Sequence, residues 1–180
     1  APVATAVATA APATAAPTAA PTAAPTPAPQ TKFTFTGDMK ASNEVPPVTN
    51  AEAAGTGKGT FTLDVTRDSA GKITAAKGTL AVTLSGFPAT VTPINGFHIH
   101  NAAAGVNAGV VVNSGTSASA PVQFTSGSAT ITKADITVDP ALAELIIANP
   151  AGYYFNAHTT LNPGGAVRAG HRRRNRRGCV

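Results

Sequence analysis

The stretch Gly96-Phe97-His98-Ile99-His100 places two of the four histidines two residues apart in a strand-like run. Successive side chains of an extended strand point to opposite faces. Phe97 and Ile99 would therefore share an apolar face, and His98 and His100 would share the other. Two imidazoles on one face supply half of the ligands of a copper or zinc site. The rest of the sequence decides whether the other half exists.

The same period-two alternation recurs along the chain and predicts many short strands. Val and Thr are frequent in these runs, and Gly, Asn, Ser and Pro separate them, as at the expected hairpin turn of residues 67–71. Evenly spaced short strands indicate an all-β fold, an antiparallel sandwich or barrel. The expected strands include residues 33–35, 61–65, 80–84, 110–112, 122–124, 129–132, 153–159 and 166–169.

One short helix is expected over residues 141–148, where the apolar side chains recur with a helical period. Asp139 is a good N-cap, and Pro140 suits the first helical position because its missing N–H costs nothing there. Asn149-Pro150 would end the helix. We expect Leu142, Leu145 and Ile146 to form its apolar stripe and the helix to cover one open end of the sheets.

Composition divides the chain into three parts. Residues 1–31 contain only Ala, Pro, Thr, Val and one Gln, which predicts a disordered or extended spacer, with O-glycosylation as an alternative use of its threonines. Residues 32–170 suit one folded domain of about 140 residues. Residues 171–180 are an Arg-rich tail, to which His171 is assigned without a role. Disordered or extended termini are therefore expected.

The net charge of +5 lies entirely in the tail, because eight basic and eight acidic residues balance within 32–170. The tail could contact an anionic surface or a polysaccharide nonspecifically, or remain solvated, and no specific nucleic-acid binding is expected. The one cysteine, Cys179, allows no intrachain disulfide, and no apolar run is long enough to span a membrane. The chain starts with Ala and a spacer typical of a segment that follows a removed export signal, so a secreted, periplasmic or cell-surface location is expected.

A second strand carries the third histidine of interest. Tyr154, Asn156 and His158 would share one face of it, and Arg168 would lie on the polar side of the closing strand. Four segments, in this order, resemble the signature blocks of the CHRD domain, which is named from chordin and also occurs in many exported bacterial proteins. They are Asn43-Glu44-Val45-Pro46-Pro47, Phe97-His98-Ile99-His100, Tyr154-Phe155-Asn156-Ala157-His158-Thr159 and Asn162-Pro163-Gly164-Gly165-Ala166-Val167-Arg168.

The resemblance to the CHRD domain covers roughly residues 32–170. A more distant similarity to another family suggests metal chemistry. Gly96-Phe97-His98-Ile99-His100 resembles the strand that supplies two copper ligands in copper/zinc superoxide dismutases, and His158 resembles the last copper ligand of that family. Arg168 resembles the arginine that attracts superoxide there, a catalytic role. The similarity implies a Greek-key β-sandwich with a metal site of His98, His100 and His158 on its outer surface and water in the open position.

The departures from that family are equally informative. Residues 101–122 contain no His, Asp or Glu, so the bridging histidine and the zinc ligands of the dismutases are missing, and their disulfide is impossible. Three imidazoles alone suit copper or zinc; the resemblance favours copper, with zinc second. Tyr154 and Asn156 could orient the imidazoles.

Simpler structural roles stay open beside the chemical ones. The histidines could hydrogen-bond to backbone and loops and hold the edges of the sandwich together. Arg168 could form a structural salt bridge with Glu44 instead of attracting an anion. Pro46-Pro47 would then fix the chain beside Glu44 as a rigid corner.

Two functions follow. The first is an exported CHRD-domain binding or structural module, which would bind a protein, a polysaccharide or another copy of itself in an extracellular or cell-surface assembly. The alternative is a copper-binding protein, either a superoxide dismutase-like oxidoreductase or a copper store. The sequence holds no nucleophile elbow and no phosphate-binding loop, so an enzymatic role would rest on the metal site.

Overall fold

The computed structural model describes residues 31–89 and 93–174. All of the predicted spacer except Thr31, and most of the predicted tail, lie outside these residues. Nine antiparallel strands form one continuous sheet in the order β5-β4-β7-β8-β1-β2-β3-β6, with β9 paired to β1. The strands are β1 (Lys32–Lys40), β2 (Thr56–Arg67), β3 (Ile73–Ser85), β4 (Ile94–His100), β5 (Val110–Asn113), β6 (Ala129–Val138), β7 (Tyr154–Thr159), β8 (Val167–Gly170) and β9 (Arg172–Arg173).

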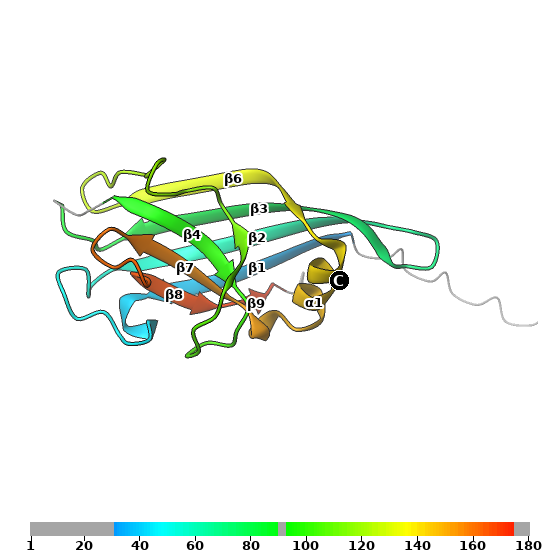
Figure 1. The fold of residues 1–180 in the computed structure, drawn as a ribbon, viewed down its shortest axis with the longest axis horizontal. Helices are drawn as coiled ribbons and strands as arrows, with labels where there is room; N and C mark the ends of the chain where they lie inside the picture. The colour runs from blue at the N-terminus through cyan, green and yellow to red at the C-terminus, as the bar shows by residue number, and fades with distance from the viewer. Residues whose placement is uncertain (1–30, 90–92, 175–180) are drawn as a thin grey trace, which may run out of the picture.

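The sheet curls on itself, so that β4, β7 and β8 lie in front of β1, β2 and β3 in Figure 1. The first three strands form a meander, and β8 near the end of the described chain pairs with β1 at its start. The predicted all-β antiparallel sandwich or barrel with one short helix is therefore confirmed. No helix among residues 31–89 and 93–174 is long and apolar enough to cross a membrane.

The core lies between the two layers and contains large aromatic side chains from both. Phe61 of β2 and Phe155 of β7 are fully buried. Gly59 of β2 lies directly against the ring of Phe155, where an added Cβ would come within 2.7 Å of the ring. Gly57 also belongs to β2, and the absence of its side chain makes room for Leu84 of the neighbouring strand β3.

The helix α1 (Pro140–Ala148) forms where the sequence predicts it. The Asp139 carboxylate accepts hydrogen bonds from the backbone N–H groups of Ala141, at 2.9 Å, and Leu142, at 3.1 Å, as an N-cap should. The expected apolar stripe is only partly correct, because Leu145 is exposed while Ile146 is buried. The helix packs against β3 at one end of the sheet (Figure 1).

Two other differences from the sequence expectations concern irregular segments. Around the expected strand of residues 122–124 the described chain forms only isolated bridges, such as that between Ile94 and Val122. The folded part also continues past residue 170. Arg172 and Arg173 form β9, which pairs with Thr36 and Phe35 of β1.

His171 is therefore part of the core and not of a tail, which corrects its assignment. It is 4% exposed, and its ring centroid lies 4.0 Å from that of Phe155. The sequence did not indicate this role, because the six residues after His171 include five arginines, which is typical of a solvated terminus. The chain is nevertheless held against the sheet here, because β9 pairs with β1 and the N–H of His171 donates to the carbonyl oxygen of Tyr153 at 2.9 Å.

Candidate metal centre

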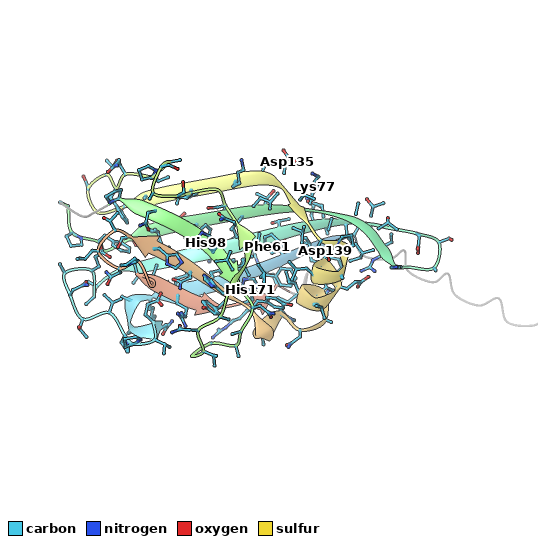
Figure 2. All side chains as sticks on the ribbon, viewed as in Figure 1. Phe61, Lys77, His98, Asp135, Asp139 and His171 are labelled. Atoms are coloured by element: carbon cyan, nitrogen blue, oxygen red, sulfur yellow. The ribbon has the colours of Figure 1, made fainter. Side chains whose placement is uncertain are left out.

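The three histidines expected to form a site lie on neighbouring strands, and their side chains meet. β4 pairs with β7 so that Gly96 is opposite His158 and His98 is opposite Asn156. Figure 2 shows His98 where β4 and β7 lie side by side. One nitrogen atom from each of His98, His100 and His158 lies within 4.8 Å of the other two. The strand register thus joins the two halves of the predicted site.

Backbone carbonyls fix which nitrogen of two rings faces inward. The Nδ1 atom of His100 lies 2.9 Å from the carbonyl oxygen of Ala108, and Nδ1 of His158 lies 3.0 Å from that of Pro163. A carbonyl oxygen only accepts, so both Nδ1 atoms carry the proton, and each Nε2 keeps its lone pair. Neutral imidazoles held in this way are the usual form of a metal-binding histidine.

Each of the three rings has one buried nitrogen without a hydrogen-bond partner within the described protein. Nδ1 of His98 and the Nε2 atoms of His100 and His158 are buried and accept no hydrogen bond. A buried polar atom without a partner costs about 1–3 kcal/mol, and here three such atoms belong to three histidines that cluster. A single cation between them would satisfy all three.

The spacing fits an ion after a small movement of the rings. Two nitrogens bound to one tetrahedral ion at about 2 Å lie roughly 3.3 Å apart, whereas the present separations reach up to 4.8 Å. A shift of each ring nitrogen by about 1 Å would bring the separations to the spacing of a tetrahedral ion, and His98 and His158 can move because they are only partly buried. His100, by contrast, is 7% exposed and packs against Tyr154.

The electrostatic surroundings keep the rings neutral. Burial, with smaller contributions from the neighbouring histidines His158 and His100, lowers the pKa of His98 to about 4. Burial likewise lowers the pKa of His158 to about 4, although the Pro163 carbonyl opposes the shift. At pH 7 these two imidazoles are therefore neutral, and they can bind a metal ion without first losing a proton.

Gly96 allows the rings to approach each other. A Cβ at this position would lie 2.7 Å from Cε1 of His98 and 3.1 Å from Cδ2 of His158. We predict that Gly96→Ala weakens metal affinity at least about tenfold, because both ligands must turn aside. A competition titration with a chromophoric chelator measures this. Gly109→Ala is the control, since nothing lies within 4 Å of its Cβ; equal affinities of the two variants would contradict the prediction.

Arg168 is buried and already forms an ion pair. It is 2% exposed, and its Nη2 lies 3.0 Å from Oε2 of Glu44. The same Nη2 donates to Oδ1 of Asn107 at 2.6 Å, and Nη1 donates to the carbonyl oxygen of Val106 at 3.3 Å. The structure thus forms the ion pair that the sequence offered as the alternative role of Arg168. Attraction of an anion by this guanidinium stays a prediction.

Tyr154 connects Arg168 to the histidines. The guanidinium carbon lies 4.3 Å from the centre of the Tyr154 ring, and that ring stacks on His100 at 4.7 Å with an angle of 4° between the planes. The Tyr154 hydroxyl also accepts a hydrogen bond from the N–H of Ala108 at 3.3 Å. Tyr154 therefore supports His100 by stacking and by holding the loop whose carbonyl binds it. Asn156 lies opposite His98, and its Oδ1 is buried without a partner.

The sequence did not reveal the two groups that orient the rings, because any residue offers a carbonyl. It also missed Glu52 and Asn162, which hold the loop that contains Pro163. Glu52 is fully buried, and its carboxylate accepts a hydrogen bond from the side chain of Asn162. The available signals were the scarcity of acidic residues in the chain and the position of Asn162 within the fourth block.

Comparison with known proteins agrees with the four sequence blocks. The CHRD domain family model matches residues 35–170, which contain every residue of the centre described above. Searches among curated proteins and among solved structures found no match, so no comparison supports the similarity to superoxide dismutases. The match covers most of the folded part, and the chain therefore belongs to the CHRD domain family.

Proposed function

We propose that this CHRD domain binds one transition-metal ion through Nδ1 of His98 and the Nε2 atoms of His100 and His158. One observation carries the proposal: the three histidines bring one nitrogen each to within 4.8 Å of one another, and each ring has a buried nitrogen without a hydrogen-bond partner. Structural histidines of a sandwich edge normally satisfy their nitrogens with protein groups. Two of these rings do so only with the nitrogen that faces away from the cluster.

Copper is the first candidate for the ion and zinc the second. Both accept imidazole ligands, but a site of nitrogen donors generally binds Cu²⁺ more tightly than Zn²⁺. Three protein ligands would leave a position open, as in catalytic metal sites. A copper ion held there would supply one-electron redox chemistry. The chain's part is to hold neutral imidazoles in fixed tautomers and to shield His100 behind Tyr154.

A titration of metal-free protein with Cu²⁺ and Zn²⁺ tests this function. We expect one Cu²⁺ per chain and a loss of at least about a hundredfold in affinity for His98→Ala or His158→Ala. His171→Phe is the matched control, because it removes a buried histidine that lies in the core and outside the cluster. Failure of wild-type protein to bind either ion, or equal losses in the control, would refute the proposal. Superoxide consumption by the copper-loaded protein would then separate a dismutase-like enzyme from a copper store.

A second candidate function, an exported module that docks on a partner or on itself, has independent support. Four of the five exposed large apolar side chains among the described residues lie on segments that surround the histidines, namely Val45, Val106, Val110 and Leu161. Residues 45–51, 101–128 and 153–167 also contain no Asp, Glu, Lys or Arg. Exposed apolar surface of this kind often marks a docking site.

The docking function has its own test. Sedimentation of the full chain at increasing concentration should reveal self-association that Val45→Asp and Leu161→Asp abolish. Leu145→Asp is the control, because Leu145 is the fifth exposed apolar side chain and lies on α1. If all variants remain monomeric like the wild type, self-association is excluded. We propose an extracellular or cell-surface site of action, supported by the Ala/Pro/Thr-rich spacer of residues 1–31.

A further inference from the structure

We propose that Glu52 is a positioning residue for the metal centre, which sets the tautomer and the place of His158 through Asn162 and the Pro163 carbonyl. This inference rests on the proposed metal binding. Glu52 lies in the connection between β1 and β2, 107 residues before its partner Thr159. A segment far away in the sequence would thus determine whether the third ligand is available.

The carboxylate of Glu52 holds both sides of the turn that follows His158. Its Oε2 accepts a hydrogen bond from Oγ1 of Thr159 at 2.6 Å and another from Nδ2 of Asn162 at 2.6 Å. Thr159 directly follows His158, and Asn162 directly precedes Pro163. Distances this short are typical of hydrogen bonds to an ionised acceptor, which are about twice as strong as neutral ones.

Asn162 is held by further contacts that fix the turn as a unit. Its side-chain Oδ1 accepts from Nδ2 of Asn50 at 2.9 Å, and its backbone N–H donates to Oγ1 of Thr159 at 3.1 Å. Its carbonyl accepts from the N–H of Gly165 at 3.1 Å. The next carbonyl along the chain, that of Pro163, is the one that binds Nδ1 of His158 at 3.0 Å.

Burial of a carboxylate costs free energy, and its use to hold this loop therefore indicates a positioning role. Glu52 is 0% exposed, and removal of a carboxylate from water needs compensating hydrogen bonds. The turn itself contains Gly164 and Gly165, whose backbone is otherwise permissive. Without the carboxylate, Pro163 would no longer be held against His158. The ring could then turn and protonate Nε2 instead of Nδ1.

Two near-isosteric substitutions test the role of Glu52 without removing the carboxylate itself. Asn162→Asp replaces the donating amide with a second carboxylate, which repels Glu52, and Thr159→Val removes the hydroxyl that donates to it. In the metal-free protein, ¹⁵N NMR of the imidazoles should show His158 protonated at Nδ1 in the wild type and a mixture of tautomers in Asn162→Asp and in Thr159→Val. Circular dichroism checks that each variant folds.

Copper binding gives the second readout. We expect Asn162→Asp to lower Cu²⁺ affinity by about 10–100-fold and pulsed EPR to show two coupled imidazoles in place of three. Asp139→Ala is the control, because it weakens the cap of α1 and so lowers stability without touching the turn. A single Nδ1–H tautomer and three coupled imidazoles in Asn162→Asp would overturn the role of Glu52. Failure of wild-type protein to bind copper would refute the metal site alone, because the tautomer measurement needs no metal.

Discussion

Arg168→Met is expected to lower the free energy of unfolding by about 3–5 kcal/mol, because removal of one partner leaves the other charge buried and unpaired. Glu44 is 4% exposed, and its Oε1 already lacks a hydrogen-bond partner. Burial raises the pKa of Glu44 to about 7, although the Arg168 charge opposes that shift. The guanidinium also binds Asn107 and lies over Tyr154, so several contacts are lost together.

Chemical denaturation measures this effect, and a double variant isolates the charge. Glu44→Met combined with Arg168→Met should recover most of the loss, since buried ion pairs are often replaceable by apolar residues. The defect of the single variant should be larger at pH 8 than at pH 5. The pKa of buried Glu44 is higher in the folded chain than in the unfolded chain. As the pH rises, a Glu44 without its partner must therefore ionise inside the protein, and the free energy of unfolding falls. A loss below about 1 kcal/mol would show that the pair is dispensable, as many exposed pairs are.

Acid should destabilise the metal-free protein through His171 by about 3 kcal/mol between pH 7 and pH 4. Burial lowers the pKa of His171 from 6.5 to about 3, and both ring nitrogens lack a hydrogen-bond partner. The ring stacks with Phe35 at 5.9 Å and lies 4.0 Å from Phe155. Below pH 6.5 the unfolded chain takes up a proton that the folded chain does not, so stability falls until the pH reaches about 3.

His171→Phe isolates this contribution. Phenylalanine keeps an aromatic ring among the neighbours of His171 and removes two buried nitrogens without partners, so the variant should be at least as stable as the wild type at pH 7. The difference in the free energy of unfolding between the variant and the wild type should then grow by about 3 kcal/mol from pH 7 to pH 4. Other titrating groups contribute equally to both proteins and cancel. Parallel pH profiles for the two proteins would contradict the burial of a neutral His171.

The sequence predicts most of the three-histidine cluster because strand geometry is local. In His98-Ile99-His100 the period of two puts both imidazoles on one face wherever the strand lies. His158 required one more step, namely that β7 pairs with β4, and the CHRD blocks placed these strands in a common fold. The helix was predictable for the same reason: Asp139 and Pro140 act on the backbone of their own first turn.

The other features of the site and of the core depend on tertiary contacts, which leave no local pattern in the sequence. Pro163 and Ala108 orient the rings through carbonyl groups, which every residue has. Glu52 acts on residues more than 100 positions away. His171 enters the core because β9 pairs with β1, and a run of arginines conceals that pairing.

The most direct test of the central claim is a crystal structure of the copper-loaded domain with anomalous diffraction recorded at the copper edge. We predict one strong anomalous peak, bound by Nδ1 of His98 and by the Nε2 atoms of His100 and His158, each at about 2 Å. The Nδ1 atoms of His100 and His158 should still donate to Ala108 and Pro163. Copper at another position, or a cluster that stays empty with copper in excess, would contradict the account.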